Sequence, residues 1–395
     1  MYDFQKAYDN LKPILNETKL FYSDYFSEIG HNNVYIKPEN LQKTGSFKIR
    51  GAYNKISKLD EDSKNKGIIT ASAGNHAQGV AYSANKQNIK AVIVMPETTP
   101  MIKVDGTLKY GAEVVLHGKT FDESNEYAIS QAKEKGYTFI PPFDDPDVIE
   151  GQGTIAIDIL NNLEYVDYIL VPVGGGGLVS GIAKCAKTLN PYVKIIGVEP
   201  ANAASMQESL KEGKIVKLDS VDTIADGTAV AKVGGLTYEI SRDYVDDWIS
   251  ITEEEILETF TELMEKHKLV AEPSGILSIA ASKKVQFFNK NIVCVVSGGN
   301  IDMSFISQLI NKGLYASGRI HRFVFDLPHS PGNLVKLLDV FTSTKANILT
   351  VNQDAIARSS RFKNISVEVT VETNGKAHLN KIKNQLIKEG YLKND

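Results

Sequence analysis

Cysteine is scarce in this chain of 395 residues, and the two cysteines present, Cys185 and Cys294, lie in apolar stretches without C-x-x-C spacing. The sequence therefore indicates neither a disulfide framework nor a structural zinc site, and a reducing, cytoplasmic environment is expected. A basic excess is also missing, because 44 lysines and arginines face 48 aspartates and glutamates, which gives a formal net charge of −4. Binding to nucleic acid or to an anionic membrane is therefore not expected.

Long apolar runs are absent as well. The longest, residues 169–182, is interrupted by four consecutive glycines and is shorter than the ~20 residues that cross a bilayer. Residues 1–10 carry two aspartates and a lysine, with no apolar core of signal-peptide length. We expect neither a membrane segment nor an export signal. The composition, 42% hydrophobic and 23% charged, is that of a folded globular protein.

Short β-branched runs alternate with longer helical patterns between residues 33 and 312. This alternation predicts an α/β fold built on open, mostly parallel sheets. The predicted strands are 34–36, 68–70, 91–95, 113–116, 169–173, 195–198 and 292–296, and the predicted helices are 47–59, 75–86, 121–135, 176–189 and 253–267. Such sheets bind ligands in the crevice beyond the carboxyl ends of their strands, where we expect the chemistry.

The pattern changes near the C-terminus to a βαββα series, with strands at 323–325, 348–351 and 365–371 and helices at 334–341 and 379–388. The series is long enough for a small domain of its own. We therefore divide the chain into a catalytic domain, 1–312, a linker, 313–320, and an appended domain, 321–395.

A lysine, Lys48, lies in the motif TGSFKIRGA, residues 44–52, at the predicted start of a helix. The positive end of the helix dipole makes this an unusual place for a cation, although an ordinary solvated lysine is the alternative. Phe47 and Ile49 supply an apolar wall that can lower the pKa of the Lys48 amine. A neutral amine is nucleophilic, so Lys48 is a candidate Schiff-base lysine.

Four glycines, Gly174 to Gly177, separate a predicted buried strand from a helix. Glycines allow successive backbone N–H groups to converge on an anion, and the helix N-terminus adds its positive end. A tight turn with close helix packing is the alternative, but it explains one or two glycines better than four. The pattern matches neither GxGxxG nor a P-loop, so the predicted phosphate need not belong to a nucleotide.

Two further strand ends carry small polar residues into the same crevice. Residues 70–79 include Ser72 and Asn75, and residues 295–302 include Ser297 and two glycines. Helix capping alone accounts for one such loop, since Ser and Asn favour helix starts. Four such loops directed into one crevice indicate a binding site, in which N–H groups and the Ser72 hydroxyl hold a carboxylate.

Through these motifs, the sequence resembles the threonine dehydratase (threonine ammonia-lyase) family of fold-type II pyridoxal-phosphate (PLP) enzymes. The resemblance covers roughly residues 21–314, with TGSFKIRGA, SAGNHAQGVA, GGGGL and SGGNID in the family's order. It implies a tryptophan synthase β-like catalytic domain of two open parallel-sheet subdomains. The smaller, mobile subdomain would comprise approximately residues 45–150.

The resemblance also implies the residues of the site. Lys48 would form the Schiff base with PLP and act as the catalytic base, Asn75 would bond the ring hydroxyl, and Ser297 would face the pyridine nitrogen. The implied cofactor-binding set is Phe47, Lys48, Asn75, Gly174, Gly175, Gly176, Gly177, Leu178 and Ser297. The implied set that binds the substrate carboxylate is Ser72, Ala73, Gly74, Asn75 and His76.

Two departures from related patterns bear on the reaction. Related serine racemases have a serine, the second acid-base group, where this chain has Ala73, so elimination is favoured over racemisation. Relatives bind a cation through a glutamate, a carbonyl and an aspartate where this chain has Glu199 and, at the aspartate position, Ser205. Because an anionic ligand is missing, we predict no metal site and interpret Glu199 as a solvated surface residue, with a weak or monovalent site as the alternative.

The C-terminal series resembles an ACT domain, a ferredoxin-like amino-acid sensing module, through Pro331-Gly332-Asn333-Leu334 after its first strand. That resemblance implies a regulatory site near Asn333 and Leu334, with isoleucine or valine as the allosteric ligand. The alternative is a purely structural oligomerisation domain, because edge strands of such sheets readily pair.

These observations predict a PLP-dependent threonine dehydratase that converts L-threonine to 2-oxobutanoate and ammonia, and L-serine to pyruvate, in isoleucine biosynthesis or threonine catabolism. The expected partners are small amino acids and further copies of the chain, as a homodimer or homotetramer. A serine or threonine racemase, or a β-replacing synthase on the same fold, is the nearest alternative. A catalytically inactive amino-acid sensor is the alternative from another class.

Overall fold

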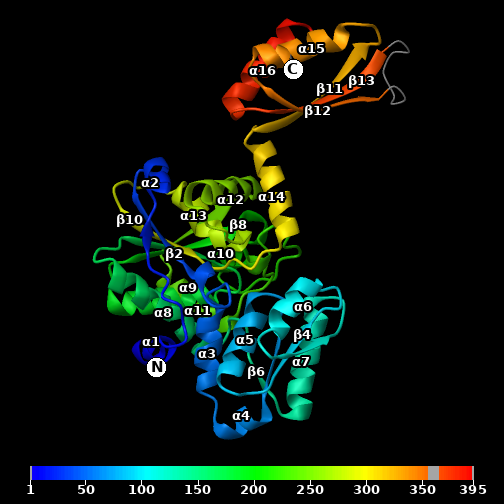
Figure 1. Cartoon of the computed structure of the whole chain (residues 1–395). Coiled ribbons are helices and arrows are strands. Elements are labelled where there is room, and N and C mark those ends of the chain that lie inside the picture. The colour runs from blue at the N-terminus through cyan, green and yellow to red at the C-terminus, as the bar shows by residue number, and fades with distance from the viewer. Residues whose placement is uncertain (1, 355–363, 394–395) are drawn as a thin grey trace. The chain divides into compact units, whose positions relative to one another are not determined.

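The chain forms two units in the computed structural model, which describes residues 2–354 and 364–393 (Figure 1). The larger unit is Met1–Met303 and the smaller unit is Ser304–Asp395. The four loops expected to carry the chemistry all belong to the larger unit. Within the described ranges, we find no helix with the length and apolar character needed to cross a bilayer.

The main sheet of the larger unit has six strands in the order β1-β2-β10-β7-β8-β9. Their bounds are β1 (Phe21–Tyr22), β2 (Asn33–Pro38), β10 (Asn291–Val296), β7 (Tyr168–Pro172), β8 (Lys194–Pro200) and β9 (Asp247–Ile251). All neighbours pair in parallel except β1, which runs antiparallel to β2 at one edge. Strands β7, β8 and β10 are buried along nearly their whole length, as in parallel sheets covered by helices.

A second, four-stranded sheet is parallel throughout, in the order β5-β4-β3-β6. Its strands are β5 (Glu113–Leu116), β4 (Ala91–Met95), β3 (Ile68–Ala71) and β6 (Thr138–Phe139). Ile68 packs in one core cluster with residues of α5 (Asn75–Lys86), whereas Ile69 packs in another with a residue of α7 (Phe121–Lys135). The predicted α/β fold with open parallel sheets is thus confirmed, and this sheet lies within residues 45–150, the range expected for the smaller subdomain.

Helices pack around both sheets of the larger unit (Figure 1). Helix α3 (Lys48–Ser57) contacts α5 and α8 (Pro146–Asn162), and α8 packs closely on α9 (Gly177–Leu189). A Cβ atom at Gly181 of α9 would lie 2.3 Å from the Ile149 carbonyl oxygen, so glycine permits this close approach. The remaining helices of this unit are α1 (Phe4–Leu11), α2 (Asp24–Gly30), α4 (Glu61–Lys66), α6 (Met101–Leu108), α10 (Ser205–Glu212), α11 (Gly235–Tyr244), α12 (Glu253–His267) and α13 (Leu277–Ser282).

The smaller unit contains a three-stranded antiparallel sheet in the order β11-β13-β12. After α14 (Met303–Ala316), its elements are β11 (Ile320–Pro328), α15 (Asn333–Ser343), β12 (Asn347–Asp354), β13 (Asn364–Glu372) and α16 (Lys376–Lys388). Along β13, every second residue is buried against α15 and α16, which is typical of a sheet with one covered face. The elements follow the predicted βαββα order.

The structure contains several elements that the sequence analysis did not predict, and two differences concern the linker and the longest helix. Residues 313–316, expected at the start of a linker, form the last turn of α14, and Gly313 is buried within that helix. A single glycine lowers helix propensity by only about 1 kcal/mol and does not end a helix by itself. Helix α8 was not predicted, because its buried residues surround the helix almost completely and leave no amphipathic period to detect.

Candidate active site

Lys48 is the first residue of α3, and the loop before it is fixed against the loop that follows β10. Ser46 forms an isolated β-bridge with Gly298, and the Phe47 N–H donates to the Ser297 carbonyl at 3.0 Å. The main chains around the predicted lysine and the predicted Ser297 are therefore joined directly, although they are far apart in the sequence.

The Lys48 amine lies deep in the protein even though part of the side chain remains accessible. Its Nζ donates to the Pro142 carbonyl at 2.8 Å and lies 5.3 Å from the centroid of the Phe47 ring. Burial lowers the pKa of Lys48 to about 8, while the Glu272 carboxylate acts in the opposite direction. A larger fraction of this amine than of an exposed lysine is therefore neutral near physiological pH, and the neutral form is the one that acts as a nucleophile or a general base.

The four glycines lie between β7 and the N-terminus of α9, where Gly176 has a positive φ of 90° and no side chain caps the helix. Cβ atoms added at Gly174 and Gly175 would lie 2.9 Å from Thr228 Cα and 2.3 Å from the Phe143 ring. A side chain would thus fill this loop, while the free N–H groups of the first helical turn remain for an anion. The loop fits the phosphate group of PLP.

The loop between β3 and α5 has tight local geometry. The Ser72 Oγ accepts a hydrogen bond from the Gly74 N–H at 3.2 Å, and a Cβ atom at Gly74 would meet nothing within 4 Å. His76 is buried, and its Nε2 lies 3.0 Å from the Ile140 carbonyl oxygen. Burial and the nearby Lys48 charge lower the pKa of His76 to about 3, so this ring is neutral. The His76 side chain faces β6, which leaves its backbone for the predicted substrate contact.

Asn75, the first residue of α5, is held from both sides by side chains of two other segments. Its Nδ2 donates to Glu272 Oε1 at 2.7 Å, and its Oδ1 accepts from Asn300 Nδ2 at 2.6 Å. Burial raises the pKa of Glu272 to about 7, although the Asn75 hydrogen bond opposes this rise. Asn300 belongs to the SGGNID motif, whereas no motif pointed to Glu272.

Residues 142–144 connect the lysine, the glycine loop and α11. Pro142 accepts from Lys48, the Phe143 ring lies against Gly175, and Asp144 accepts from the backbone N–H groups of residues 235, 236 and 237 at 3.0 to 3.1 Å. Asp144 therefore satisfies the free N–H groups at the start of α11. The sequence predicted no role for this stretch.

Ser297 directly follows β10 and is buried, with 4% of its surface exposed. Its N–H donates to the Gly275 carbonyl at 3.3 Å, so its backbone is anchored to the segment that follows Glu272. Leu178, in the first turn of α9, packs in the core cluster of the main sheet. Lys48, Ser297 and the glycine loop are thus linked through directly contacting segments.

The interpretation of Glu199 as a solvated residue is wrong, because its side chain is completely buried. Its two carboxylate oxygens accept from the N–H groups of Met206 and Gln207, each at 2.9 Å, at the start of α10. Burial raises the pKa of Glu199 to about 7, while these hydrogen bonds act to lower it. Among the residues that the structure describes, no group of three or more His, Cys, Asp or Glu side chains could hold a metal ion.

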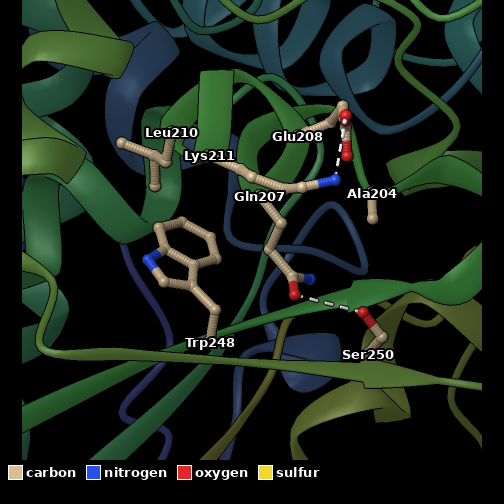
Figure 2. A pocket seen from close by; sticks show the side chains of 7 residues that line it. All are labelled: Ala204, Gln207, Glu208, Leu210, Lys211, Trp248 and Ser250. Atoms are coloured by element: carbon tan, nitrogen blue, oxygen red, sulfur yellow. Dashed lines mark hydrogen bonds and ion pairs between the residues drawn. The ribbon is translucent and has the colours of Figure 1, made fainter. Parts of the chain in front are cut away.

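A surface hollow of about 380 Å³ lies beside this helix (Figure 2). Its lining residues are Ala204, Gln207, Glu208, Leu210, Lys211, Trp248 and Ser250. Figure 2 shows the Trp248 indole at one side and the Gln207 amide bonded to the Ser250 hydroxyl, at 3.2 Å. None of the predicted site residues lines this hollow, so it is separate from the candidate active site.

Comparison with known proteins identifies the family. The sequence profile of the family described as pyridoxal-phosphate dependent enzyme matches residues 11–298. The chain is 44% identical over 393 residues to the L-threonine ammonia-lyase of Thermotoga maritima, across 98% of this chain and 97% of that protein. The processed form of threonine deaminase isoform 2 from Solanum lycopersicum superposes with a TM-score of 0.75 at 41% identity, covering 78% of this chain and 92% of that one. Maize serine racemase superposes with a TM-score of 0.74 at 34% identity, covering 79% and 97%.

The profile match and the site agree on the cofactor. The glycine loop, which has no room for side chains, lies at the N-terminus of α9. The Lys48 amine donates to the Pro142 carbonyl, and the ring of the next residue, Phe143, lies against this loop. The family match covers most of the larger unit, and the relatives' alignment extends over nearly the whole chain. The chain belongs to the family of pyridoxal-phosphate-dependent enzymes that includes the L-threonine ammonia-lyases.

Proposed function

We propose that this protein is a threonine ammonia-lyase, which converts L-threonine to 2-oxobutanoate and ammonia, and L-serine to pyruvate, by α,β-elimination. The observation that carries the proposal is the buried Lys48 amine, whose pKa is lowered to about 8 beside the segment that contacts the glycine loop. The names of the relatives support threonine as the substrate.

Bound PLP supplies an electron sink that acidifies the α-carbon of the substrate amino acid. The residues proposed to hold it are Gly174 to Gly177 and Leu178 at the phosphate, Asn75 at the ring hydroxyl and Ser297 at the pyridine nitrogen. Ser297 offers a neutral hydroxyl where a carboxylate would favour a protonated ring. A less delocalised negative charge at the α-carbon then favours loss of the β-hydroxyl group.

Lys48 is the proposed general base that removes the α-proton, besides binding the cofactor covalently. This role requires a neutral amine, which burial supplies. Because the pKa is lowered to about 8, the neutral fraction rises through this pH, and kcat should rise with it. The loop from Ser72 to His76 is the proposed site of the substrate carboxylate, with the Gly74 and Asn75 backbone at its centre.

Elimination, and not racemisation, is proposed because of Ala73. Racemisation needs a second acid-base group on the face of the α-carbon opposite Lys48, and an alanine methyl group cannot transfer a proton. The likeness to maize serine racemase keeps racemisation as the alternative activity. The two activities differ in product, so one assay separates them.

Product identification tests the proposal. Purified protein with PLP is incubated with L-threonine or L-serine, and oxoacids, ammonia and D-amino acids are measured, with Lys48→Ala as the control. We expect 2-oxobutanoate from threonine, pyruvate from serine, and little D-serine. Predominant D-serine would establish the racemase, a new amino acid formed with an added nucleophile would establish the synthase, and no visible cofactor absorbance would favour the inactive sensor.

For the smaller unit we propose an ACT-like regulatory function, with residues 1–312 as the catalytic domain and 321–395 as the regulatory domain. The proposed amino-acid site is near Asn333 and Leu334 at the start of α15, with isoleucine or valine as the ligand. There the exposed Asn333 Nδ2 donates to the Pro328 carbonyl at 3.1 Å and to Ser330 Oγ at 2.7 Å. Leu334 packs against the core of the unit, so a ligand held here could act on α15.

A further inference from the structure

A chain of hydrogen bonds runs beside the lysine loop and ends at a carboxylate with no role in the reaction described above. Asn300 Nδ2 donates both to the Thr44 carbonyl, at 2.7 Å, and to Asn75 Oδ1, at 2.6 Å. Asn75 Nδ2 in turn donates to Glu272 Oε1 at 2.7 Å. Three amide or carboxylate side chains from three separate segments thus form one relay.

The direction of this relay is determined at both ends. The Thr44 carbonyl can only accept, so the Asn300 amide must present its Nδ2 to it. The same Nδ2 faces Asn75, which therefore presents Oδ1 to Asn300 and Nδ2 to Glu272. Glu272 accepts at the far end. Asn75 uses one of its two N–H hydrogens on Glu272, and the other remains available for a ligand.

The backbone is shaped to let the carboxylate reach Asn75. The Glu272 N–H donates to the Gly298 carbonyl at 3.1 Å. A Cβ atom at Gly298 would lie 2.5 Å from Glu272 Oε1 and 3.0 Å from Asn75 Nδ2, so a side chain there would separate the two. Gly298 directly follows Ser297, the residue proposed to face the pyridine nitrogen. The relay therefore lies next to the proposed cofactor site, and its two side-chain hydrogen bonds at Asn75 are partly buried.

We propose that Glu272 is a positioning residue that, with Asn300, holds the Asn75 amide so that its second N–H is directed to the ring hydroxyl of PLP. The inference rests on the proposed cofactor site, since it assigns a task to Asn75 there. Glu272 acts through Asn75 and does not itself take part in proton transfer. Without it, the partly buried Asn75 amide loses an acceptor and the constraint that prevents its rotation.

The charge of Glu272 depends on its neighbours. Burial raises the pKa of Glu272 to about 7. The Asn75 hydrogen bond and the charges of Lys103 on α6 and Lys48 on α3 favour the ionised form, whereas Asp226 opposes it. The hydrogen bond from Asn75 to Glu272 should therefore weaken as the pH falls through neutrality, because an ionised carboxylate accepts more strongly than a protonated one. Bound PLP, whose visible absorbance reports the state of its ring hydroxyl, should follow this titration.

PLP affinity and a double-mutant cycle test the proposal without relying on turnover. The dissociation constant of PLP is measured by titrating apoprotein for wild type, Glu272→Ala, Asn75→Ala and the double variant. We expect each single change to weaken binding by about tenfold, and the double variant to be no weaker than Asn75→Ala alone. Additive losses, or wild-type affinity in Glu272→Ala, would overturn the relay.

Glu272→Gln tests the hydrogen-bond acceptor separately from the charge of the carboxylate. This variant also replaces Glu272→Ala as the test if the alanine variant fails to fold. The glutamine carbonyl still accepts from Asn75, so PLP affinity should remain within about threefold of wild type. The change of cofactor absorbance with pH near 7 should disappear. The matched control is Glu262→Gln on α12, whose carboxylate bonds Tyr25 and Lys283, and which should leave both readouts unchanged. An unaltered pH titration in Glu272→Gln would contradict the proposal.

These outcomes are independent of the substrate assignment. If wild-type protein binds PLP but forms no oxoacid from threonine or serine, the proposed function is wrong. The double-mutant cycle on PLP affinity still measures the coupling between Glu272 and Asn75 in that case. If wild type forms 2-oxobutanoate while the Glu272 variants match it in affinity and spectrum, only the positioning role is wrong.

Discussion

At the scale of single residues, the environment of a side chain decides which chemistry it can perform. The Lys48 amine gains its neutral form from burial, and the nearby Glu272 charge limits how far the pKa falls. His76 experiences the same burial with an added positive neighbour, which keeps it uncharged. A neutral His76 beside Lys48 does not repel the amine when the amine takes up a proton.

Lys48→Ala should abolish turnover while the fold survives, because the variant loses both the covalent attachment of PLP and the proposed base. The measurements are oxoacid formation from threonine, the visible absorbance of bound cofactor and a thermal melt. Lys43→Ala, an exposed lysine just before the motif, is the matched control. Near-native activity in Lys48→Ala would show that the site assignment is wrong.

Ala73→Ser should raise the fraction of L-serine that leaves as D-serine, because it adds a proton donor to the loop where the second acid-base group is expected. Chiral analysis of the remaining serine, together with pyruvate release, gives the ratio of the two reactions. In wild type this ratio should strongly favour pyruvate. A large D-serine yield from wild type, or no change in the variant, would contradict the opposite-face argument.

At the scale of elements, the conformation of the glycine loop depends on neighbouring segments that leave no room for side chains. The glycine loop after β7 lies against Phe143 and Thr228, so its backbone amides stay open to an anion. Phe143 is part of the segment whose Pro142 carbonyl accepts from Lys48, so the glycine loop and the lysine depend on the same support.

Gly175→Ala should weaken PLP binding by about tenfold or more, because the added methyl group would lie 2.3 Å from the Phe143 ring and push the loop or the ring away. Gly235→Ala is the matched control, since a Cβ atom there meets nothing within 4 Å. The readout is the PLP dissociation constant of the apoprotein. Equal affinities in the two variants would remove the support for a phosphate cradle.

A buried ionic cluster joins β2, α3 and α8 just behind Lys48. Arg50 makes two hydrogen bonds to Glu39, each 2.8 Å long, and Lys37 reaches Asp158 at 3.0 Å and Glu39 at 3.4 Å. Burial alone would raise the pKa of Glu39, but Arg50 and Lys37 outweigh it and lower the pKa to about 2. The ionised carboxylate therefore stabilises the fold above its unfolded pKa, and this contribution is lost as the pH falls towards about 2.

Glu39→Gln should lower the free energy of unfolding by about 3–5 kcal/mol, because it leaves buried cations without their partner. Urea unfolding at neutral pH measures the change. Glu61→Gln, in an exposed ion pair with Lys64, serves as the control and should change stability little. A loss in Glu39→Gln as small as in the control would show that the cluster contributes little.

At the scale of the whole molecule, the residues proposed for catalysis all precede Met303, so all of them lie in the larger unit. The smaller unit has its own core of three strands and two helices. A regulatory ligand changes activity only if it binds two states of the protein with different affinity. The proposed sensing role therefore predicts that removing the site removes the response.

A chain that ends at Ala316, the last residue of α14, should keep PLP and dehydratase activity but lose any response to isoleucine or valine. The measurement is activity against threonine concentration, with and without each amino acid, for the full-length and the shortened protein. A response that survives truncation, or full-length protein that responds to neither amino acid, would contradict the sensing role. Loss of solubility on truncation would support the oligomerisation alternative.

The sequence by itself determined the features that depend on neighbouring residues. Buried strands appear as short apolar runs, and the loops after them carry glycine, serine and asparagine, so the sheets, Lys48 and the glycine loop could be predicted. The βαββα series could be recognised for the same reason, because alternation along residues 365–371 shows which face is buried. All of these signals are local.

Only the tertiary structure decided which distant residues meet. Glu272 reaches Asn75 from 197 positions away, and Asp144 bonds the start of α11 from 91 positions away or more. Nothing in the sequence around either residue indicates such a contact, because side-chain hydrogen bonds across loops follow no period. The burial of the Glu199 side chain likewise could not be seen in the sequence, because it depends on the position of α10, whose first N–H groups bond the carboxylate. Local pattern thus predicted the lysine and its loops, and the packing of separate segments brought distant residues into contact with them.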